Sequence, residues 1–126
     1  MRVLFIEDDQ MNRRVVRDML QLAGAEMSEA VDGPSGLDMI EEASFDIVLM
    51  DLRMPGMDGM TAINHVRTRA DEKAMLPIIV VTADTALDIK ERCLSGGADA
   101  VILKPVAMRE LFDTIGKALV RAKTQH

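Results

Sequence analysis

The sequence predicts an α/β fold in which five parallel strands alternate with five helices. Three runs of apolar residues, at positions 3–6, 47–50 and 78–81, show no polar alternation. Continuous apolar runs of this length are typical of strands that helices cover on both faces, as in a parallel sheet. Stretches with helical spacing separate the runs, and they are long enough for right-handed crossovers between parallel strands.

Size and composition limit the classes of protein to which the chain can belong. With 126 residues it is expected to form one domain that buries roughly two thirds of its unfolded surface. The net charge of -6 and the lack of Trp and Tyr argue against a nucleic-acid-binding protein. A single cysteine, Cys93, excludes an internal disulfide and fits a reducing compartment. Because no apolar run approaches the ~18 residues of a membrane span, we expect a cytoplasmic protein that does not bind membranes.

The first strand, 3–6, is followed by a helix expected from about residue 10 to 23. Asp9 is placed to cap the start of this helix, and Gly24 is placed to end it. The side chains at helical spacing, which predict its buried face, are those of Met11, Val15, Val16, Met19, Leu20, Leu22 and Ala23.

The next stretch, 27–30, is short and half polar, which is typical of an edge strand. Asp32 and Gly33 turn the chain, and Pro34 suits the first turn of a helix that runs to about residue 43. The third strand is the apolar run 47–50, which ends directly at the carboxylate of Asp51.

In the C-terminal half, helices and strands alternate in the same way. The third helix is expected to direct Ile63 and Val66 inward, and Pro77 closes a polar connection before the fourth strand. The expected elements are a helix at about 60–70, a strand at 78–81, a helix from 85 or 86 to 94, a strand at 101–103 and a helix at about 107–123.

The strand order follows from the polarity of the strands. The three most apolar strands should be central and the polar second strand should lie at an edge. The order 2-1-3-4-5 satisfies both conditions, and it is the order of a flavodoxin-like, doubly wound sheet. In this order the first and third strands are neighbours at the switch point, where a crevice opens at the carboxyl ends of the strands.

Four strand ends meet at that crevice, and the first two carry acids: Glu7-Asp8-Asp9 and Asp51. Two carboxylates ~5 Å apart repel each other by about 3 kcal/mol at an effective dielectric constant of ~20. Such a cluster must raise its pKa values or bind a cation. Because the donors are hard oxygens with no nearby histidine or thiol, the sequence predicts Mg²⁺, with Mn²⁺ as the alternative, over zinc.

The other two strand ends carry Thr82 and Lys104. Taken alone, a threonine is an ordinary strand residue and a lysine an ordinary solvated strand end. Beside Asp51, a hydroxyl, an ammonium and a metal ion would together stabilise the charge on a phosphoryl group in transfer. Asp51 is then predicted to be the nucleophile that forms an acyl phosphate.

These residues resemble the response-regulator receiver domain of two-component signalling, and the resemblance extends from residue 3 to about 122. It depends on four motifs in the right order and spacing, each weakly specific alone: the acids after the first strand, Asp51 with the loop 54–59, Thr82-Ala83 and Lys104-Pro105. The resemblance implies that Asp51 is the phospho-acceptor. The implied donor is a phosphohistidine, on a histidine kinase or a histidine phosphotransfer protein.

The resemblance also implies roles for the neighbouring residues. Asp9 and Asp51 would bind the metal directly, Asp8 would act through water, and the carbonyl of Arg53 would add an oxygen.

Thr82, Lys104 and the backbone N–H of Ala83 would contact the phosphoryl group. The domain would catalyse its own phosphorylation and dephosphorylation without being an enzyme in the usual sense.

One position departs from the pattern. The family often has Tyr or Phe three residues before the lysine, and here that residue is Val101. Without an aromatic switch, output is expected through the loop after Asp51 or through the first helix, where a kinase or phosphotransfer helix would dock. The stretches 10–13 and 91–97 resemble receivers of hybrid kinases and phosphorelays more than those of DNA-binding regulators. We expect residues 1–126 to form one receiver domain with no output domain, acting on an unknown protein target as a monomer or weak homodimer.

Two further residues are predicted to set the lifetime of the phosphate. Arg53 lies two positions after Asp51, and Asp84 lies two positions after Thr82. We hypothesise that they pair across the mouth of the site and hinder the attacking water. The alternative is a pair of separate surface side chains.

Three other functions are alternatives. A haloacid-dehalogenase-like phosphohydrolase would need a second Asp where this chain has Arg53. A flavodoxin would need a phosphate-binding loop where this chain has three acids. A receiver that acts as a constitutive binding module would not need Asp51, Thr82 and Lys104, yet the sequence leaves it open that the partners ignore phosphorylation.

Overall fold

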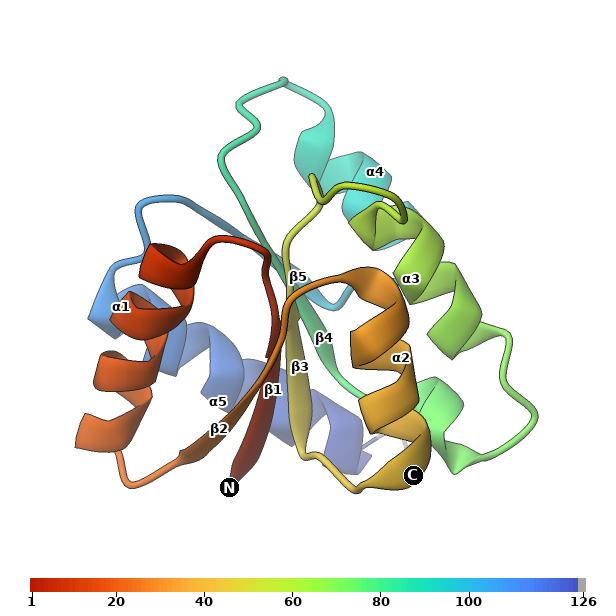
Figure 1. The fold of residues 1–126 in the computed structure, drawn as a ribbon, viewed down its shortest axis with the longest axis horizontal. Coiled ribbons are helices and arrows are strands. Elements are labelled where there is room, and N and C mark those ends of the chain that lie inside the picture. The colour runs from red at the N-terminus through yellow and green to blue at the C-terminus, as the bar shows by residue number, and fades with distance from the viewer. Residues whose placement is uncertain (125–126) are drawn as a thin grey trace.

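Five parallel strands form a single sheet in the order β2-β1-β3-β4-β5, which confirms the predicted flavodoxin-like fold (Figure 1). The computed structural model describes residues 1–124. The strands are β1 (Arg2–Ile6), β2 (Glu26–Ala30), β3 (Ile47–Met50), β4 (Ile78–Thr82) and β5 (Ala100–Leu103). The helices are α1 (Gln10–Leu22), α2 (Gly33–Glu42), α3 (Gly59–Arg67), the short 3₁₀ helix η1 (Glu72–Met75), α4 (Ile89–Ser95) and α5 (Met108–Thr124).

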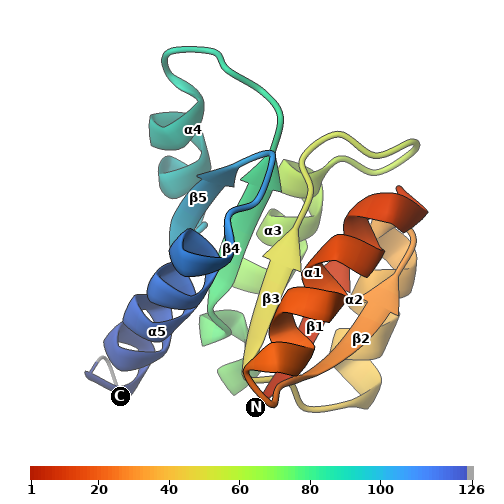
Figure 2. The same cartoon turned by 90° about the vertical axis from the view of Figure 1, so that its left-hand side faces the viewer.

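Helices cover both faces of the sheet, with α1 and α5 on one face and α2, α3 and α4 on the other (Figures 1 and 2). Side chains of β1 alternate between the two resulting cores. Val3 and Phe5 pack with residues of α1 and α5, whereas Leu4 and Ile6 pack with residues of α2, α3 and α4. Because every residue of β3 and β4 is buried, these strands carry no polar alternation, as the sequence indicated.

The buried face of α1 is narrower than predicted. Val16 and Leu20 are buried, whereas Met11, Val15 and Leu22 are 65%, 41% and 78% exposed. Two residues four positions apart form one stripe along the helix, and that stripe is what meets the sheet. The prediction was therefore wrong for the three exposed residues, which leaves apolar side chains on the surface of α1.

Helix α4 begins at Ile89, three or more residues later than predicted. The chain after Thr82 forms a loop that projects above the sheet (Figure 1). Asp84 holds this loop, because its Oδ1 accepts a hydrogen bond from the backbone N of Ala86 at 2.9 Å and its Oδ2 pairs with Arg53. The predicted helix therefore starts only after the part of the chain that these contacts fix. The polar connection before β4 also differs, since it contains η1.

Glycine is required where α3 approaches β3. A Cβ atom at Gly59 would lie 2.4 Å from the carbonyl oxygen of Asp51, which no larger residue could tolerate. The backbone N of Gly59 also donates a hydrogen bond to the carbonyl oxygen of Leu52 at 2.8 Å. The start of α3 therefore packs directly on the backbone of the residue that ends the central strand.

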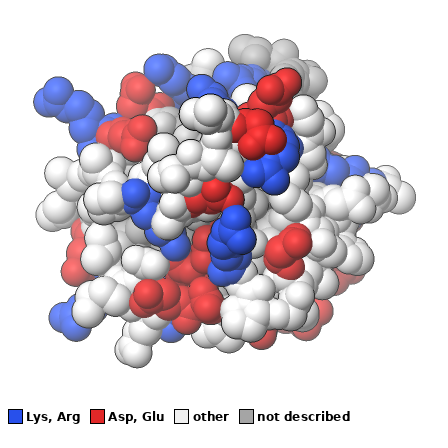
Figure 3. Space-filling view, turned by 90° about the horizontal axis from the view of Figure 1, so that it is seen from above, with Lys and Arg blue, Asp and Glu red and all other residues white. Residues whose placement is uncertain are grey.

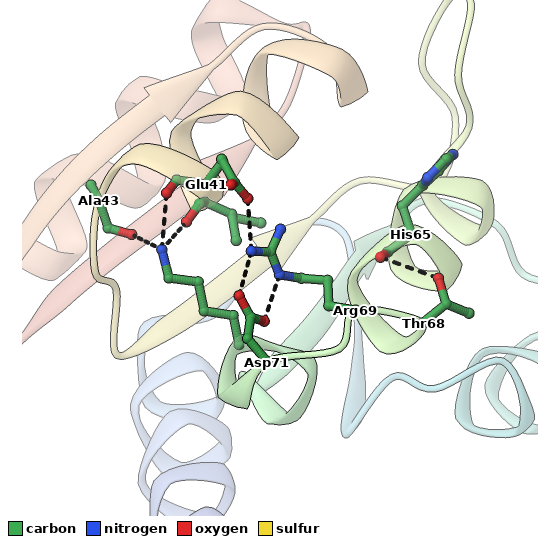
Figure 4. Close-up of polar contacts among 8 residues, drawn as sticks. Glu41, Ala43, His65, Thr68, Arg69 and Asp71 are labelled. Carbon is green, nitrogen blue, oxygen red and sulfur yellow. Dashed lines mark hydrogen bonds and ion pairs between the residues drawn. The ribbon is translucent and has the colours of Figure 1, made fainter.

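At the opposite edge of the sheet, Lys73 and Arg69 join α2 to the segment after α3 (Figure 4). The Nζ atom of Lys73 donates hydrogen bonds to the carbonyl oxygens of Ile40, Glu41 and Ala43, at 2.6, 3.1 and 3.2 Å. These carbonyls belong to the last turn of α2, whose acceptors have no partners within the helix. Arg69 bridges Glu41 and Asp71, each at 2.7 Å. This corner is a structural cap, distant from the carboxyl ends of the strands.

Among residues 1–124, no helix has the length and apolar character needed to cross a membrane.

Candidate functional site

Asp51 is the first residue after β3 and lies at the carboxyl edge of the sheet. Its backbone N donates to the carbonyl oxygen of Ile6 at 3.0 Å, which ties it to the end of the neighbouring strand. Although polar, Asp51 is only 5% exposed. Its Oδ1 atom lies 3.6 Å from the Nζ of Lys104 and 3.5 Å from the backbone N of Arg53. The nearly buried carboxylate of Asp51 therefore faces the ammonium group of Lys104, at a distance longer than a hydrogen bond.

Three carboxylates gather at this edge: those of Glu7, Asp8 and Asp51, with one oxygen of each within 4.8 Å of the others. Glu7 is fully buried and Asp8 is exposed. The Oε2 atom of Glu7 is buried and accepts no hydrogen bond among the described residues. A buried acceptor without a partner is costly unless something outside the chain fills it. An all-oxygen donor set with one unpaired buried oxygen fits a hard divalent cation such as Mg²⁺.

Asp9, a predicted metal ligand, does not belong to this group. Its Oδ1 accepts hydrogen bonds from the backbone N of Met11 at 2.8 Å and of Asn12 at 3.4 Å, which makes it the N-cap of α1. Glu7, which the sequence placed among the acids of the crevice but not among the metal ligands, belongs to the group instead. The sequence carries a signal for this difference. Asp9 stands where the N-cap of α1 is expected, and a capping residue directs its carboxylate toward the helix that it caps.

Lys104 follows β5 and reaches across the edge of the sheet to Glu7, with its Nζ 2.7 Å from Oε1. Burial alone would lower the pKa of Lys104, but the hydrogen bond to Glu7 and the charge of Asp51 outweigh it and raise that pKa. Burial and the adjoining Asp51 carboxyl group raise the pKa of Glu7. Glu7 therefore retains its proton more readily than a carboxyl group in water does. The peptide bond between Lys104 and Pro105 is cis.

Thr82 ends β4 and is buried, and Ala83 follows it on the surface. The Oγ1 atom of Thr82 accepts a hydrogen bond from the backbone N of Asp84 at 3.1 Å. Because this bond uses an acceptor site of the hydroxyl oxygen, the O–H remains free to donate. The strand order thus brings Thr82 to the same edge as Asp51, one strand away.

Arg53 and Asp84 form the predicted pair, with Nη2 of Arg53 2.6 Å from Oδ2 of Asp84. The Arg53 side chain is 77% exposed, whereas that of Asp84 is 11% exposed. Hydrogen bonding from Ala86 and the guanidinium of Arg53 lower the pKa of Asp84. Seen from above this edge, acidic and basic side chains lie next to one another on the surface (Figure 3).

A cavity of about 670 Å³ adjoins this pair on the side of α4. Its apolar lining includes Leu52, Met54 and the buried Cys93, whose thiol pKa is raised by burial. The side chain of Cys93 therefore packs among apolar residues.

A family model described as the response regulator receiver domain matches residues 3–116. Among curated proteins, the sensor histidine kinase RcsC of Escherichia coli strain K12 is 35% identical over 115 residues, which cover 91% of this chain and 12% of RcsC. The sensor protein GacS of Pseudomonas syringae is 34% identical over 118 residues, which cover 92% of this chain and 13% of GacS. The chain thus spans about an eighth of the length of these relatives.

Solved structures agree in fold. A response regulator structure from Chloroflexus aurantiacus superposes with a TM-score of 0.89 at 28% identity, covering 94% of this chain and 97% of that chain. The receiver domain of the sensor histidine kinase PA1611 from Pseudomonas aeruginosa superposes with a TM-score of 0.85 at 29% identity, covering 94% of this chain and 96% of that chain. That domain was solved with a magnesium ion coordinated in its active-site cleft.

Proposed function

This chain belongs to the response regulator receiver domain family, and we propose that Asp51 is the residue at which it accepts a phosphoryl group from a phosphohistidine. The observation that carries the proposal is the meeting of Asp51, Lys104 and two further carboxylates at one edge of the sheet. In the reaction, an Asp51 carboxylate oxygen attacks phosphorus, the P–N bond breaks, and the imidazole leaves with its electron pair. The product is an acyl phosphate on Asp51.

Lys104, Thr82 and Ala83 are the residues proposed to stabilise this transfer. The Nζ of Lys104 lies 3.6 Å from the Asp51 carboxylate, so a modest shift from Glu7 brings it onto a phosphoryl oxygen. The O–H of Thr82 and the backbone N–H of Ala83 supply two more donors at the same edge. The chain's own residues thus catalyse its modification, and the modified form acts as a signalling switch.

We propose that Glu7, Asp8 and Asp51 hold the divalent cation, Mg²⁺ or alternatively Mn²⁺, with Asp9 left to cap α1. The cation would supply positive charge against the phosphoryl oxygens. Asp8→Asn should weaken Mg²⁺ binding by roughly tenfold or more. Asp9→Asn should leave it nearly unchanged, because asparagine caps helices as well as aspartate does. The reverse ranking would restore Asp9 as the ligand, as the resemblance to receiver domains implied. A contribution from the Arg53 carbonyl stays a prediction.

The proposed donor is a histidine kinase or a histidine phosphotransfer protein, since the relatives are histidine kinases that contain this domain. The proposed docking face lies beside the site, where the exposed Val15 of α1 stands near Pro105 and Val106 and the exposed Met11 precedes it by one helical turn. Val15, Pro105 and Val106 line a shared depression of about 120 Å³. We also propose that the phosphorylated domain passes on its signal by contact with a further protein.

The proposal is tested by transfer from a purified phosphohistidine protein. A phosphate that is labile to hydroxylamine and maps by peptide mass spectrometry to Asp51 is the expected result. Phosphate elsewhere on the chain, or equal phosphate on the Asp51→Asn variant, would overturn the assignment.

A further inference from the structure

Arg13, in the first turn of α1, connects three elements around the acidic cluster. Its Nη1 donates a hydrogen bond to the backbone carbonyl oxygen of Glu7 at 2.8 Å. Its Nε pairs with Oε1 of Glu29, on β2, at 3.2 Å. The Arg13 side chain is 13% exposed, so these contacts are largely shielded from water and hold the guanidinium firmly.

The carbonyl that Arg13 binds belongs to the residue at which β1 gives way to the acidic loop. The backbone N of Glu7 donates to the carbonyl oxygen of Ala30 at 2.9 Å, which continues the pairing of β1 with β2. The sheet thus holds one polar group of the Glu7 backbone, and Arg13 holds the other. With both held, the directions in which the Glu7 and Asp8 side chains leave the backbone are set.

Arg17, one turn further along α1, provides a built-in comparison. It also forms an ion pair with Glu29, through Oε2. In the part of the chain that the structure describes, Arg17 makes this pair without reaching the Glu7 carbonyl. Its side chain is 40% exposed. The two arginines therefore share an acidic partner and differ in contact with the acidic loop.

We propose that Arg13 is a positioning residue for the cation site: it fixes the backbone of Glu7 so that the Glu7 and Asp8 carboxylates face Asp51. This inference rests on the proposed function and adds to it a residue that touches neither cation nor phosphate. It resembles the outer-layer hydrogen bonds that orient ligands in metal sites. The path of the effect runs from the guanidinium through the Glu7 carbonyl to the two acidic side chains.

Loss of Arg13 should change the affinity for a divalent cation in opposite directions, depending on whether Arg13 acts through its charge or by positioning the ligands. Removing the positive charge of Arg13, which contacts the backbone of Glu7, should by itself tighten the binding of a divalent cation to the acidic cluster. Releasing the Glu7 carbonyl should instead weaken binding, since the ligands must then be ordered at the moment the ion binds. A weaker Mg²⁺ complex after loss of Arg13 is therefore not explained by charge.

The experiment is a calorimetric Mg²⁺ titration of the wild type, Arg13→Gln and Arg17→Gln, at a temperature at which circular dichroism shows all three folded. We expect the dissociation constant to rise about tenfold in Arg13→Gln. In Arg17→Gln it should stay within about twofold of the wild type. Equal dissociation constants in the two variants, or tighter binding in Arg13→Gln, would overturn the proposal.

A second pair of variants covers the case in which Arg13→Gln does not fold. Arg13→Lys and Arg17→Lys both keep the charge, but a single ammonium cannot reproduce the forked contacts of a guanidinium. Weaker Mg²⁺ binding in Arg13→Lys than in Arg17→Lys supports the positioning role, and equal binding rejects it. A wild type that binds no Mg²⁺ would instead reject the proposed cation site itself, so the two failures are distinguishable.

Discussion

Glu7 is a buried acid whose neighbours favour its protonated form. Burial, followed by the adjoining Asp51 carboxyl group, raises the pKa of Glu7 above its ordinary value of 4.5. The folded chain therefore binds this proton more tightly than the unfolded chain does. The resulting stabilisation is complete below the ordinary pKa and is lost as the pH rises through the raised value.

Glu7→Gln should consequently raise the melting temperature in EDTA, and the gain should grow from about pH 4 to about pH 8. If the buried carboxylate costs about 1 kcal/mol, the gain at the upper end is about 4 °C. Lys104 keeps an anionic neighbour in this variant, because Asp51 lies 3.6 Å away. Calorimetry over this pH range checks the trend, with the exposed Glu42→Gln as the control for charge. A gain that is independent of pH would show that Glu7 is ionised throughout.

The ion pair of Arg53 and Asp84 stands beside Asp51, and its predicted role is to slow hydrolysis of the acyl phosphate. Arg53→Ala and Asp84→Ala should each shorten the half-life of the phosphate, by up to about fivefold, since an exposed pair contributes up to ~1 kcal/mol. The double variant should hydrolyse no faster than the faster single variant, because the two residues act through one contact.

The half-life is measured by intact mass spectrometry after the phosphoryl donor is removed. Arg92→Ala is the matched control, because Arg92 lines the same cavity but pairs with Asp88. An unchanged half-life in both single variants would show that the pair does not shield the phosphate.

The exposed apolar residues at the start of α1 are expected to contact the phosphohistidine protein that docks on this helix. Met11→Glu should lower the rate of phosphotransfer from a phosphohistidine protein by about tenfold, as expected for an apolar residue at the centre of an interface. Phosphorylation by acetyl phosphate, which needs no docking, should be unchanged. Leu22→Glu, at the other end of the same helix and 78% exposed, is the control that should affect neither reaction. Equal losses with both donors would point to damage at the site itself.

Arg67 ties helix α3 to the segment that leads into β5, the outer strand of the sheet on the side away from β2. Its Nε donates to the carbonyl oxygen of Gly97 at 2.9 Å, and its Nη2 pairs with Oδ2 of Asp99 at 3.0 Å. Its Nη1 donates to the carbonyl oxygens of Ala74 and Leu76, at 2.8 and 2.7 Å. One guanidinium thus joins α3, η1 and the approach to β5.

Arg67→Gln should lower the free energy of unfolding by about 2–4 kcal/mol, because several half-buried acceptors lose their donor together. Urea denaturation gives this value directly. The comparison is Arg69→Gln, which breaks the more exposed contacts with Glu41 and Asp71 and should have a clearly smaller effect. Similar losses in both variants would mean that the Arg67 contacts add little to stability.

The elements that the sequence predicts best are those whose pattern follows from burial on both faces. The continuous apolar runs of β3 and β4 and the half-polar β2 allow little alternative to the observed order. The start of α4 was predicted less well, because it depends on the contact of Asp84 with Arg53, 31 positions away. Local propensity carries no information about such a contact. The exposed part of α1 was missed for a similar reason, since apolar spacing alone does not tell a core face from a surface.

For the molecule as a whole, strand order is what creates the site. Glu7, Asp51, Thr82 and Lys104 are far apart in the sequence, and each follows or ends a parallel strand. Their meeting could be predicted, because parallel strands direct their carboxyl ends to one edge. Which two of the three consecutive acids face Asp51 could not be predicted from strand order. That choice depends on side-chain direction, which the cap of α1 and the contact of Arg13 with Glu7 decide.

In the proposed function, the residues at this edge of the sheet catalyse phosphorylation of Asp51 with the help of Mg²⁺. The most direct test is the intact mass of the protein after incubation with acetyl phosphate, with Mg²⁺ or EDTA, for the wild type and Asp51→Asn. We predict the added mass of one phosphoryl group in the wild type with Mg²⁺, and no added mass with EDTA or in Asp51→Asn. A wild type that gains no mass with Mg²⁺, or an Asp51→Asn variant that gains the same mass, would show that Asp51 is not the phosphorylated residue of a Mg²⁺-dependent site.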